Sequence, residues 1–565
     1  MVSKILKFFN RESQGINEAA LLLGLFTFSS QILGLVRDRL LATYLGATGY
    51  LDVYYAAFRI PDLLYVSLAT LASITVILPF LNQRFTSSDT SAHEETRRFI
   101  DQIFTVLLFF LVGVSILLFI LMPWLSHVIA PGFSAADRAS LVMLSRIMLA
   151  QPILVGISNM FSSVSQMLKK FLVTALSPIF YNIGIISGIV IGYPLLGITG
   201  LAWGVVLGAC LHLGVQIPVL IKHGLTPRIT ASLRWDEIAA IVKTSLPRTL
   251  GLSFSSICMA VLISMASRLQ QGSITLLSLT SNIFSVPVGI IGVSYAVASF
   301  PSLVKAFQSQ DDAIFNDHIF HTLRKIVFFM VPVAVLFIVL RAQIIRVILG
   351  SQSFSWDNTR LAAAMIAILS LALVAQSIIH VFIRGYYAMG NTRKPLLTNI
   401  ASEGLGLLSA TGFLWLFRHV PAWHHLFQSA LRLENISSLD ILALPLAYAL
   451  GNILNALLLW KFMMKDRHLQ VPFAFVRTTI HTLIAAIGMG AVTYGFLNIL
   501  VIVIKQSTFW GIFFQGLIAG IFGLTIFTTI LLLVHNEDME ELLTTLKRKF
   551  WKQSVIQEPD QNLNV

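Results

Sequence analysis

Long apolar segments recur along the whole chain, and they restrict the kind of fold that it can adopt. Each contains about 18 or more mostly hydrophobic residues, enough for a helix to cross a hydrocarbon core of roughly 30 Å. Hydrophobic residues make up 56% of the chain and charged residues 12%, whereas soluble proteins carry about 25% charged residues. We therefore expect an all-α polytopic membrane protein, because a membrane helix satisfies its own backbone hydrogen bonds.

We expect about fourteen transmembrane helices. Basic residues concentrate in alternate loops, as at Lys169 and Lys170 or at Arg393 and Lys394, and this asymmetry predicts that both termini are cytoplasmic. The expected spans lie at roughly 19–45, 51–83, 99–129, 138–167, 172–193, 197–221, 237–266, 274–306, 318–349, 358–389, 395–417, 439–464, 474–504 and 508–535.

The two halves of the chain repeat one pattern at an offset of roughly 220 residues. The motif Pro79-x-Leu81-x-x-x-Phe85, for example, is repeated as Pro301-x-Leu303-x-x-x-Phe307. The repeat predicts two six-helix lobes of the same topology, at 1–235 and 236–467, with a helix pair at 468–536 and a cytoplasmic tail at 537–565. Parallel repeats of this kind place the substrate site at their interface and favour alternating access.

Charged residues cluster near the start of the chain, within or beside the first two expected spans. Arg37, Asp38 and Arg39 are consecutive, and Asp52 and Arg59 follow. An ionised side chain at the centre of a membrane helix costs roughly 2.5–3.5 kcal/mol on insertion scales. These residues either extend to the membrane surface or line a water-filled cavity that binds a charged substrate.

Acidic residues are almost absent from the middle of the chain: none occurs between Asp137 and Asp236, and none between Glu237 and Asp311. A cavity between the lobes is therefore expected to be electropositive and to favour an anion such as pyrophosphate. Arginine suits this task because its planar guanidinium binds phosphate oxygens in pairs. The main candidates are Arg37 and Arg59, followed by Arg39 and Arg248; the residues expected to orient the arginines or gate the outer side are Asp38, Asp52 and Asp62.

Asn399 and Glu403 suggest a second site in the eleventh expected span, where their spacing of four places them on one helix face. A carboxylate buried in the membrane is either protonated or paired with a cation, so Glu403 is a candidate for Na⁺ or H⁺ coupling. The alternative is a neutral, hydrogen-bonded Glu403 that packs against another helix.

Sequence motifs for catalysis were not found. The chain has no clustered Asp motif, no Gly-x-x-x-x-Gly-Lys-Ser/Thr loop and no His-Glu-x-x-His pair. We therefore expect a transporter without an organic cofactor, driven by an ion gradient, the membrane potential or the substrate gradient. Nucleic acid is not an expected partner, because the basic residues are scattered through loops and spans.

Several motifs resemble the MurJ (MviN) lipid II flippases of the MOP exporter superfamily. They lie in the same order and in the corresponding spans as in that family. The matching segments are Ile32-Leu33-Gly34-Leu35-Val36-Arg37-Asp38, Asp52, Ala57-Phe58-Arg59-Ile60-Pro61-Asp62-Leu63-Leu64, Pro79, Ala130-Pro131-Gly132-Phe133 and Arg384-Gly385-Tyr386-Tyr387-Ala388-Met389-Gly390-Asn391-Thr392-Arg393-Lys394-Pro395.

The resemblance implies fourteen helices in the bacterial inner membrane and transport of lipid II, a polyprenyl-pyrophosphate-linked peptidoglycan precursor, to the outer leaflet. It also implies that the last two helices form a groove for the lipid tail. Membrane lipids and the cell-wall synthesis machinery are expected partners. The Asn399/Glu403 pair resembles a Na⁺ site of the family, although the carboxylate of the family is shorter.

Three positions depart from the family, which usually has basic residues where Gln31, Tyr65 and Asn282 stand. A neutral contact in place of a charged one loses roughly 1.5–3 kcal/mol. Gln31 and Asn282 remain candidate substrate contacts, and Arg248, expected to face the cavity, is the candidate that compensates.

Two alternative functions remain open. One is an exporter of the same superfamily for another polyprenyl-linked glycan or a cationic drug, although a drug would require acidic cavity residues. The other is a homologue that no longer transports and instead scaffolds a membrane assembly, which the missing basic residues would fit. The presence of Arg37, Asp52 and Arg59 argues against the scaffold.

Overall fold

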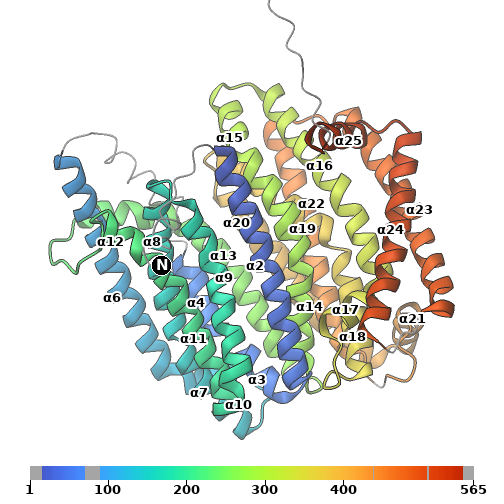
Figure 1. Ribbon diagram of the computed structural model, residues 1–565, viewed down its shortest axis with the longest axis horizontal. Coiled ribbons are helices and arrows are strands. Elements are labelled where there is room, and N and C mark those ends of the chain that lie inside the picture. Colours follow the sequence, from blue (N-terminus) through green and yellow to red (C-terminus); the bar gives the residue numbers. More distant parts are fainter. Residues whose placement is uncertain (1–15, 70–89, 437, 505–507, 551–565) are drawn as a thin grey trace, which may run out of the picture.

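The computed structural model of the chain describes residues 16–69, 90–436, 438–504 and 508–550, and every regular element in these ranges is helical (Figure 1). The elements of the first half are α2 (Ile16–Leu45), α3 (Gly49–Ala57), α4 (Arg59–Ala69), α6 (Thr90–Ile129), α7 (Ala135–Met148), α8 (Ala150–Met167), α9 (Phe171–Ser187), the π-helix η1 (Gly188–Gly192), α10 (Tyr193–Leu196), α11 (Ile198–Gly214) and α12 (Ile217–Lys222).

The second half continues the helical bundle and ends in three further helices. Its elements are α13 (Trp235–Ala266), α14 (Ser273–Pro287), the π-helix η2 (Val288–Val293), α15 (Ser294–Gln308), α16 (Asp312–Val339), α17 (Arg341–Leu349), α18 (Trp356–Ser370), α19 (Leu373–Ala388), α20 (Arg393–His419), α21 (Pro421–Leu431), the 3-10 helix η3 (Asp440–Leu442), α22 (Ala443–Arg467), α23 (Phe473–Val503), α24 (Phe509–Leu533) and α25 (Glu537–Phe550).

Eleven helices of the described residues are long and apolar enough to cross a membrane, and α18 with α19, bent by 43°, gives a twelfth span if counted as one. The all-helical membrane fold is thereby confirmed, but the number fourteen is not. Helix α2 is not in this group. The expected span 51–83 is divided into α3 and α4, and it runs into residues 70–89, which lie outside the described ranges.

Glycines allow two helices of the first half to pack closely. Gly184 and Gly188 face Gly208 and Gly204, respectively, across the contact between α9 with η1 and α11. The spacing of four residues repeats the glycines on one face of each helix, and a side chain at these positions would collide with the opposite backbone. The two helices therefore pack backbone to backbone.

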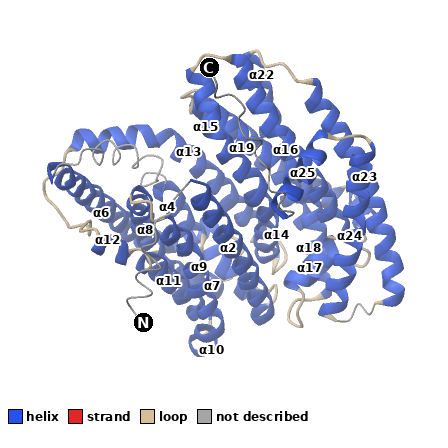
Figure 2. Ribbon diagram, turned by 45° about the horizontal axis from the view of Figure 1, so that its top comes forward, coloured by secondary structure: helices blue, strands red, loops and turns tan. Residues whose placement is uncertain are grey.

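The two halves contact each other at the end of the bundle that bears α3, opposite α25 (Figure 1). Ser351 donates a hydrogen bond of 3.0 Å to the carbonyl of Ala42, and Ser264 donates one of 2.8 Å to the carbonyl of Val128. Figure 2 shows the helices of the first half grouped beside those of the second half. The boundaries of two six-helix lobes remain a prediction.

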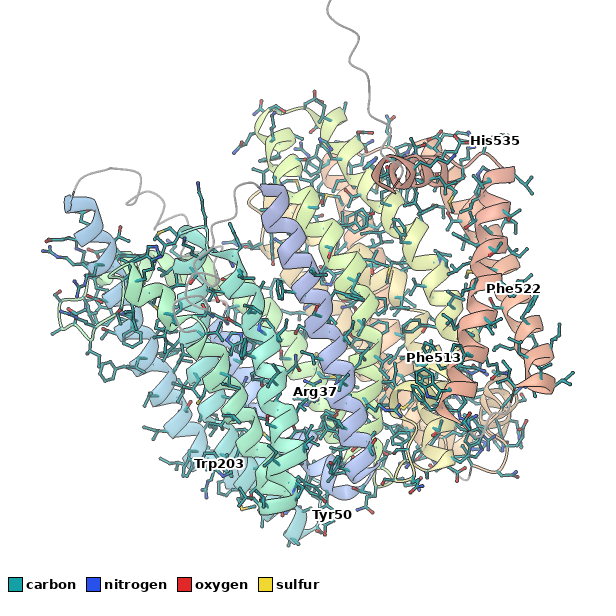
Figure 3. The ribbon with its side chains drawn as sticks, in the orientation of Figure 1. Arg37, Tyr50, Trp203, Phe513, Phe522 and His535 are labelled. Carbon is teal, nitrogen blue, oxygen red and sulfur yellow. The ribbon has the colours of Figure 1, made fainter. Side chains whose placement is uncertain are left out.

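The last three helices pack on the second half. Helices α23 and α24 run along each other, and α23 also packs along α16. Helix α25 is attached to α16 by ion pairs of Asp538 with Arg324 at 3.2 Å and with Lys325 at 2.8 Å. Aromatic side chains such as Tyr50, Trp203 and Phe522 are exposed on the outside (Figure 3), as expected where a protein surface faces lipid.

Candidate functional site

Helix α14 presents one polar face to the first half of the chain. Thr275, Ser278 and Asn282 are spaced by three and four residues, so they share this face, and we call them the α14 stripe. Each contacts a charged residue of the first half by a hydrogen bond. Their partners, in order, are Asp52, Arg59 and Asp38.

The carboxylate of Asp52 binds the N-terminus of α14. The backbone N–H groups of Gly272 and Thr275 and the hydroxyl of Thr275 donate to it, each at 2.7 Å. A helix N-terminus carries partial positive charge and unpaired N–H groups, so it stabilises a carboxylate. Gly272 has a φ of +90°, which favours glycine, and a side chain there would meet the carbonyl of Ala47. Asp52 thus joins the two halves through a helix terminus; its partner is not an arginine, and the expectation that it orients the arginines or gates the outer side stays a prediction.

Arg37 and Asp38 form an ion pair on α2. Arg37 is labelled on this helix in Figure 3. The Nε of Arg37 donates to Oδ1 of Asp38 at 2.9 Å, and the amide of Asn282 donates to Oδ2 at 3.0 Å. Gln31, two turns earlier on α2, lies beside Gly289 of η2. The neutral Asn282 therefore shares the buried Asp38 with Arg37, and Gln31 lies along the same junction.

Arg39 lies away from this pair, contrary to the expectation that it contributes to the same site. Its guanidinium donates to the carbonyl of Val347 and lies 4.8 Å from the centre of the Phe509 ring. Arg39 follows Arg37 by two positions, a rotation of about 200° that directs the side chains to opposite faces. Arg39 therefore connects α2 with α17 and α24.

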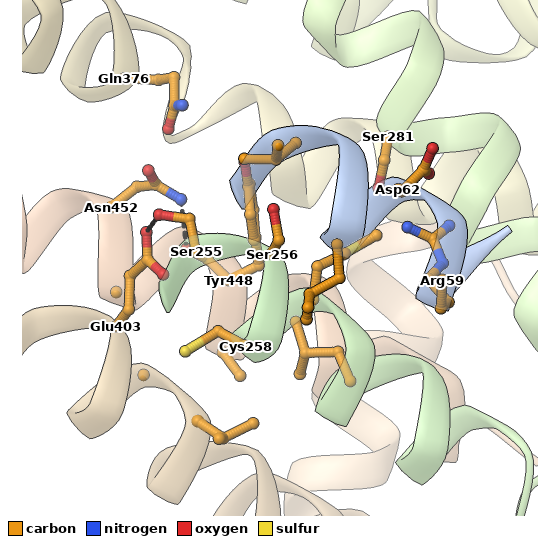
Figure 4. Close-up of a pocket in the computed structure, with 18 of the residues that line it drawn as sticks. Arg59, Asp62, Ser255, Ser256, Cys258, Ser281, Gln376, Glu403, Tyr448 and Asn452 are labelled. Atoms are coloured by element: carbon orange, nitrogen blue, oxygen red, sulfur yellow. Dashed lines mark hydrogen bonds between the residues drawn. The ribbon is translucent and has the colours of Figure 1, made fainter. Parts of the chain in front are cut away.

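A cavity of about 530 Å³ lies between α4 of the first half and α13, α20 and α22 of the second (Figure 4). Arg59 and Asp62 line one side, and Glu403 lines the other. The Arg59 guanidinium donates to the hydroxyl of Ser278 at 3.4 Å, while its buried Nε has no hydrogen-bond partner among the described residues. The charged lining is one arginine and two carboxylates, so these residues do not supply the expected excess of positive charge.

Asn399 and Glu403 belong to a hydrogen-bonded cluster beside this cavity. Ser255 of α13 donates to Oε1 of Glu403 at 2.7 Å, and the amide of Asn399 donates to Ser255 at 2.9 Å. The amide of Asn455 in turn donates to Asn399 at 3.0 Å. Oε2 of Glu403 and Oδ1 of Asn455 are buried and have no hydrogen-bond partner in the part of the chain that the structure describes. Oxygen atoms of this kind suit a hard cation or, at the carboxylate, a proton.

Arg248 and Tyr65 are the two remaining positions singled out from the sequence. The side chain of Arg248 is outside the described residues, so its expected role stays a prediction. Tyr65 lines the cavity, and its hydroxyl accepts a hydrogen bond of 3.4 Å from the amide of Asn159. The sequence did not identify Ser255 or the stripe residue Thr275 as site residues. The α14 stripe does have a signal in the sequence, because its polar residues are spaced by three and four positions within an apolar span.

Comparisons with known proteins agree on one family. The model of the family "Lipid II flippase MurJ" matches residues 41–514. The lipid II flippase MurJ of Burkholderia cenocepacia is 26% identical over 402 residues, which cover 70% of this chain and 77% of the relative. The probable lipid II flippase MurJ of Vibrio cholerae is 25% identical over 541 residues, covering 92% and 97%.

Solved structures show the same fold. A lipid II flippase MurJ in an inward closed conformation has a TM-score of 0.70 at 22% identity, and the match covers 90% of this chain and 98% of that one. An inward-facing multidrug resistance MATE family transporter of the MOP superfamily has a TM-score of 0.63 at 15% identity, covering 78% and 95%. Because the family match extends over most of its length, this multi-span membrane protein belongs to the lipid II flippase MurJ family.

Proposed function

We propose that this chain moves lipid II from the inner to the outer leaflet of a bacterial cytoplasmic membrane, with both termini in the cytoplasm. The relatives that it resembles over most of their length are named lipid II flippases or probable lipid II flippases. The observation that carries the proposal is the position of Arg59 between the two halves, at a cavity, with a buried Nε that has no described partner. A guanidinium with an available donor is suited to bind a pyrophosphate group.

In this proposal Arg37 and Arg59 bind the pyrophosphate. In the structure, Arg37 is paired with Asp38. A pyrophosphate group carries more negative charge than one carboxylate, so it competes with Asp38 for the Arg37 guanidinium. Gln31 and Asn282, which lie along the same junction, supply neutral hydrogen bonds to the substrate. The site therefore depends on two arginines, with neutral donors where other family members have charge.

Alternating access requires the contacts at the α3 end to break. In the proposed orientation this end faces outward, and the three partners of the α14 stripe keep it closed. Rocking of the halves about their interface opens the outer side when these hydrogen bonds separate. Substrate that draws Arg59 away from Ser278 removes one of these three hydrogen bonds and so favours this separation.

The Glu403 cluster is the proposed site of coupling to Na⁺ or H⁺. Its two unpartnered buried oxygens, on Glu403 and Asn455, are available to a cation or a proton. The cluster joins α13, α20 and α22, so its occupancy affects how these helices pack. One charge that crosses a potential of 100 mV releases about 2.3 kcal/mol, enough to bias a two-state carrier. A Glu403→Gln variant that keeps full dependence on the ion gradient would exclude this role.

The lipid tail is assigned to residues 468–536, the segment of α23 and α24. Ile487 of α23 and Ile521 of α24 are large, apolar and exposed, which suits contact with a polyprenyl chain. Substrate would thus lie with its head at the arginines and its tail along the outside of the second half.

Complementation of a flippase-depleted bacterium tests the proposal. At matched expression, wild type is expected to restore growth, whereas Arg37→Ala and Arg59→Ala are expected to fail. Arg146→Ala is the matched control, because Arg146 stacks on Phe119 away from the cavity. Failure of well-expressed wild type would instead favour another polyprenyl-linked substrate or a scaffold, and rescue by both alanine variants would show that flipping does not depend on these two arginines.

A further inference from the structure

A second cavity, of about 420 Å³, lies in the part of the molecule that contains α23 and α24. Its walls come from α17, α18, α23 and α24, from the last residues of α16, and from Leu431 and Arg432 at the end of α21. Figure 1 shows α17, α18 and α21 at the end of the bundle opposite α25. The cavity shares no lining residue with the cavity of Arg59 and Glu403, so it is a separate site.

Three arginines, Arg341, Arg360 and Arg432, line this second cavity. Arg341 donates to the carbonyl of Ile338 at 3.1 Å, in the last turn of α16. Arg360 donates to the carbonyl of Glu434 at 2.9 Å and lies 3.9 Å from the Glu434 carboxylate. That carboxylate is exposed, and within the described ranges it is the only acidic group in an ion pair with any of the three. The arginines therefore give the cavity a net positive charge.

Arg432 ends helix α21 in a left-handed conformation and lies at the cavity. Its φ is 56°, in the left-handed region that residues with a side chain rarely adopt. One guanidinium nitrogen donates to the hydroxyl of Tyr494 at 2.6 Å.

Part of the remaining wall of the cavity is apolar, and on α23 it lies beside exposed aliphatic side chains. Leu497 and Val501 of α23 line the cavity. Ile499, Ile502 and Val503, on the same turns of α23, are exposed large aliphatic side chains. Guanidinium groups and hydrocarbon contact are thus available side by side, which is the combination that an anionic amphiphile requires.

We propose that this cavity binds the phosphate headgroup of an anionic membrane lipid, with the hydrocarbon chains of that lipid along the end of α23. Arg341 and Arg432 contact the phosphate oxygens with the nitrogens that they do not use for Ile338 and Tyr494. In the orientation proposed above, the lipid belongs to the outer leaflet. The arginines lie outside the cavity of Arg59 and Glu403, and binding of the lipid is measured directly, so the test does not depend on flipping.

Native mass spectrometry of the full-length protein in mild detergent tests the proposal with three probes: phosphatidylglycerol, phosphatidylcholine with the same acyl chains, and inorganic phosphate. Wild type is expected to retain phosphatidylglycerol at least about tenfold more tightly than R341Q/R432Q does. The control R268Q/R418Q removes two positive charges from side chains that do not line this cavity, and it is expected to bind like wild type. R341K/R432K keeps the positive charges and is expected to retain part of the affinity for phosphatidylglycerol. This variant therefore shows whether the loss of affinity in R341Q/R432Q comes from misfolding.

Each other outcome overturns the proposal. Equal retention of phosphatidylcholine would show that headgroup charge is not recognised. Equal binding of phosphatidylglycerol by R341Q/R432Q would place the lipid elsewhere. Displacement of the lipid by millimolar inorganic phosphate would show that the arginines bind free phosphate. If R341K/R432K lost as much binding as R341Q/R432Q, the effect of the substitutions would be purely structural.

Discussion

The carboxylate of Asp52 accepts a hydrogen bond of 2.7 Å from the hydroxyl of Thr275, a residue 223 positions further along the chain. Two backbone N–H groups, of Gly272 and Thr275, donate to the same buried carboxylate. Hydrogen bonds to a charged group contribute about 1.5–3 kcal/mol each. Asp52 is therefore a main attachment between the two halves at the α3 end.

Asp52→Asn is expected to shift the protein toward an open outer side by about tenfold or more, because the amide loses the charge that the helix terminus stabilises. Labelling of Ser278→Cys by a membrane-impermeant maleimide, with Cys210 and Cys258 replaced by serine, measures this opening. Thr275→Ser keeps the hydroxyl and is expected to label as slowly as the parent. Unchanged labelling in Asp52→Asn would show that Asp52 does not hold the junction closed.

Asn282→Asp is expected to destabilise the protein, because it places a second carboxylate against the buried Asp38. Asn282→Ala removes only one hydrogen bond, so its cost is smaller, about 1 kcal/mol. The apparent melting temperature of the purified variants is expected to fall in the order wild type, Asn282→Ala, Asn282→Asp. Equal temperatures for the two variants would contradict the close contact of Asn282 with Asp38.

Gly204→Val is expected to disrupt the packing of α11 against η1, because its side chain would meet the backbone of Gly188. Overpacking of this kind costs about 1–3 kcal/mol or more where backbone cannot yield. Gly214→Val is the control on the same helix, since open space surrounds Gly214. Lower yield and thermal stability of the first variant alone would support the packing, and equal effects would argue against it.

The docking of α25 is expected to weaken in acid. The hydrogen bond and the positive charge of Lys325, with Arg324 and His321 nearby, hold the pKa of the Glu541 carboxyl below its ordinary value. Because the pKa of Glu541 is lower in the docked state, its carboxylate stabilises docking at pH values above the pKa of a free glutamate, about 4.3. This stabilisation is lost as the pH falls through that value and then through the lower pKa of the docked state. Energy transfer between probes on α16 and α25 should therefore decrease between about pH 5 and pH 3.

Glu541→Gln is the control for this pH dependence. Without the titrating carboxyl, the part of the change that comes from residue 541 should disappear, while Asp538 still pairs with Arg324 and Lys325. An identical acid transition in wild type and in Glu541→Gln would assign the transition to another group.

Hydropathy was sufficient to predict the membrane class and the all-helical fold, because each apolar run has to form its own helix in lipid. It did not predict the bend between α18 and α19, since packing decides where a long apolar run bends. Nor did it predict the division of the second expected span into α3 and α4.

The candidate site was only partly predictable, for two different reasons. The direction of Arg39 was available from helical periodicity, because two positions along a helix point to opposite faces. The partner of Asp52 was not available, because the N-terminus of α14 approaches α3 only through the packing of distant segments. Glu403 and Asn399 were found from their spacing, but Ser255 belongs to another helix and comes between them only in the folded protein.

Thr275, Ser278 and Asn282 belong to one helix, so a tilt of α14 that separates one of them from its partner pulls on all three. Under the proposed alternating access the junction is therefore expected to open as a unit, because a partly opened state that admits water would retain little stabilisation. In an energised membrane such a state would be a leak for protons. In the proposed carrier, three hydrogen bonds on one helix face would thus protect the membrane potential while no substrate is being moved.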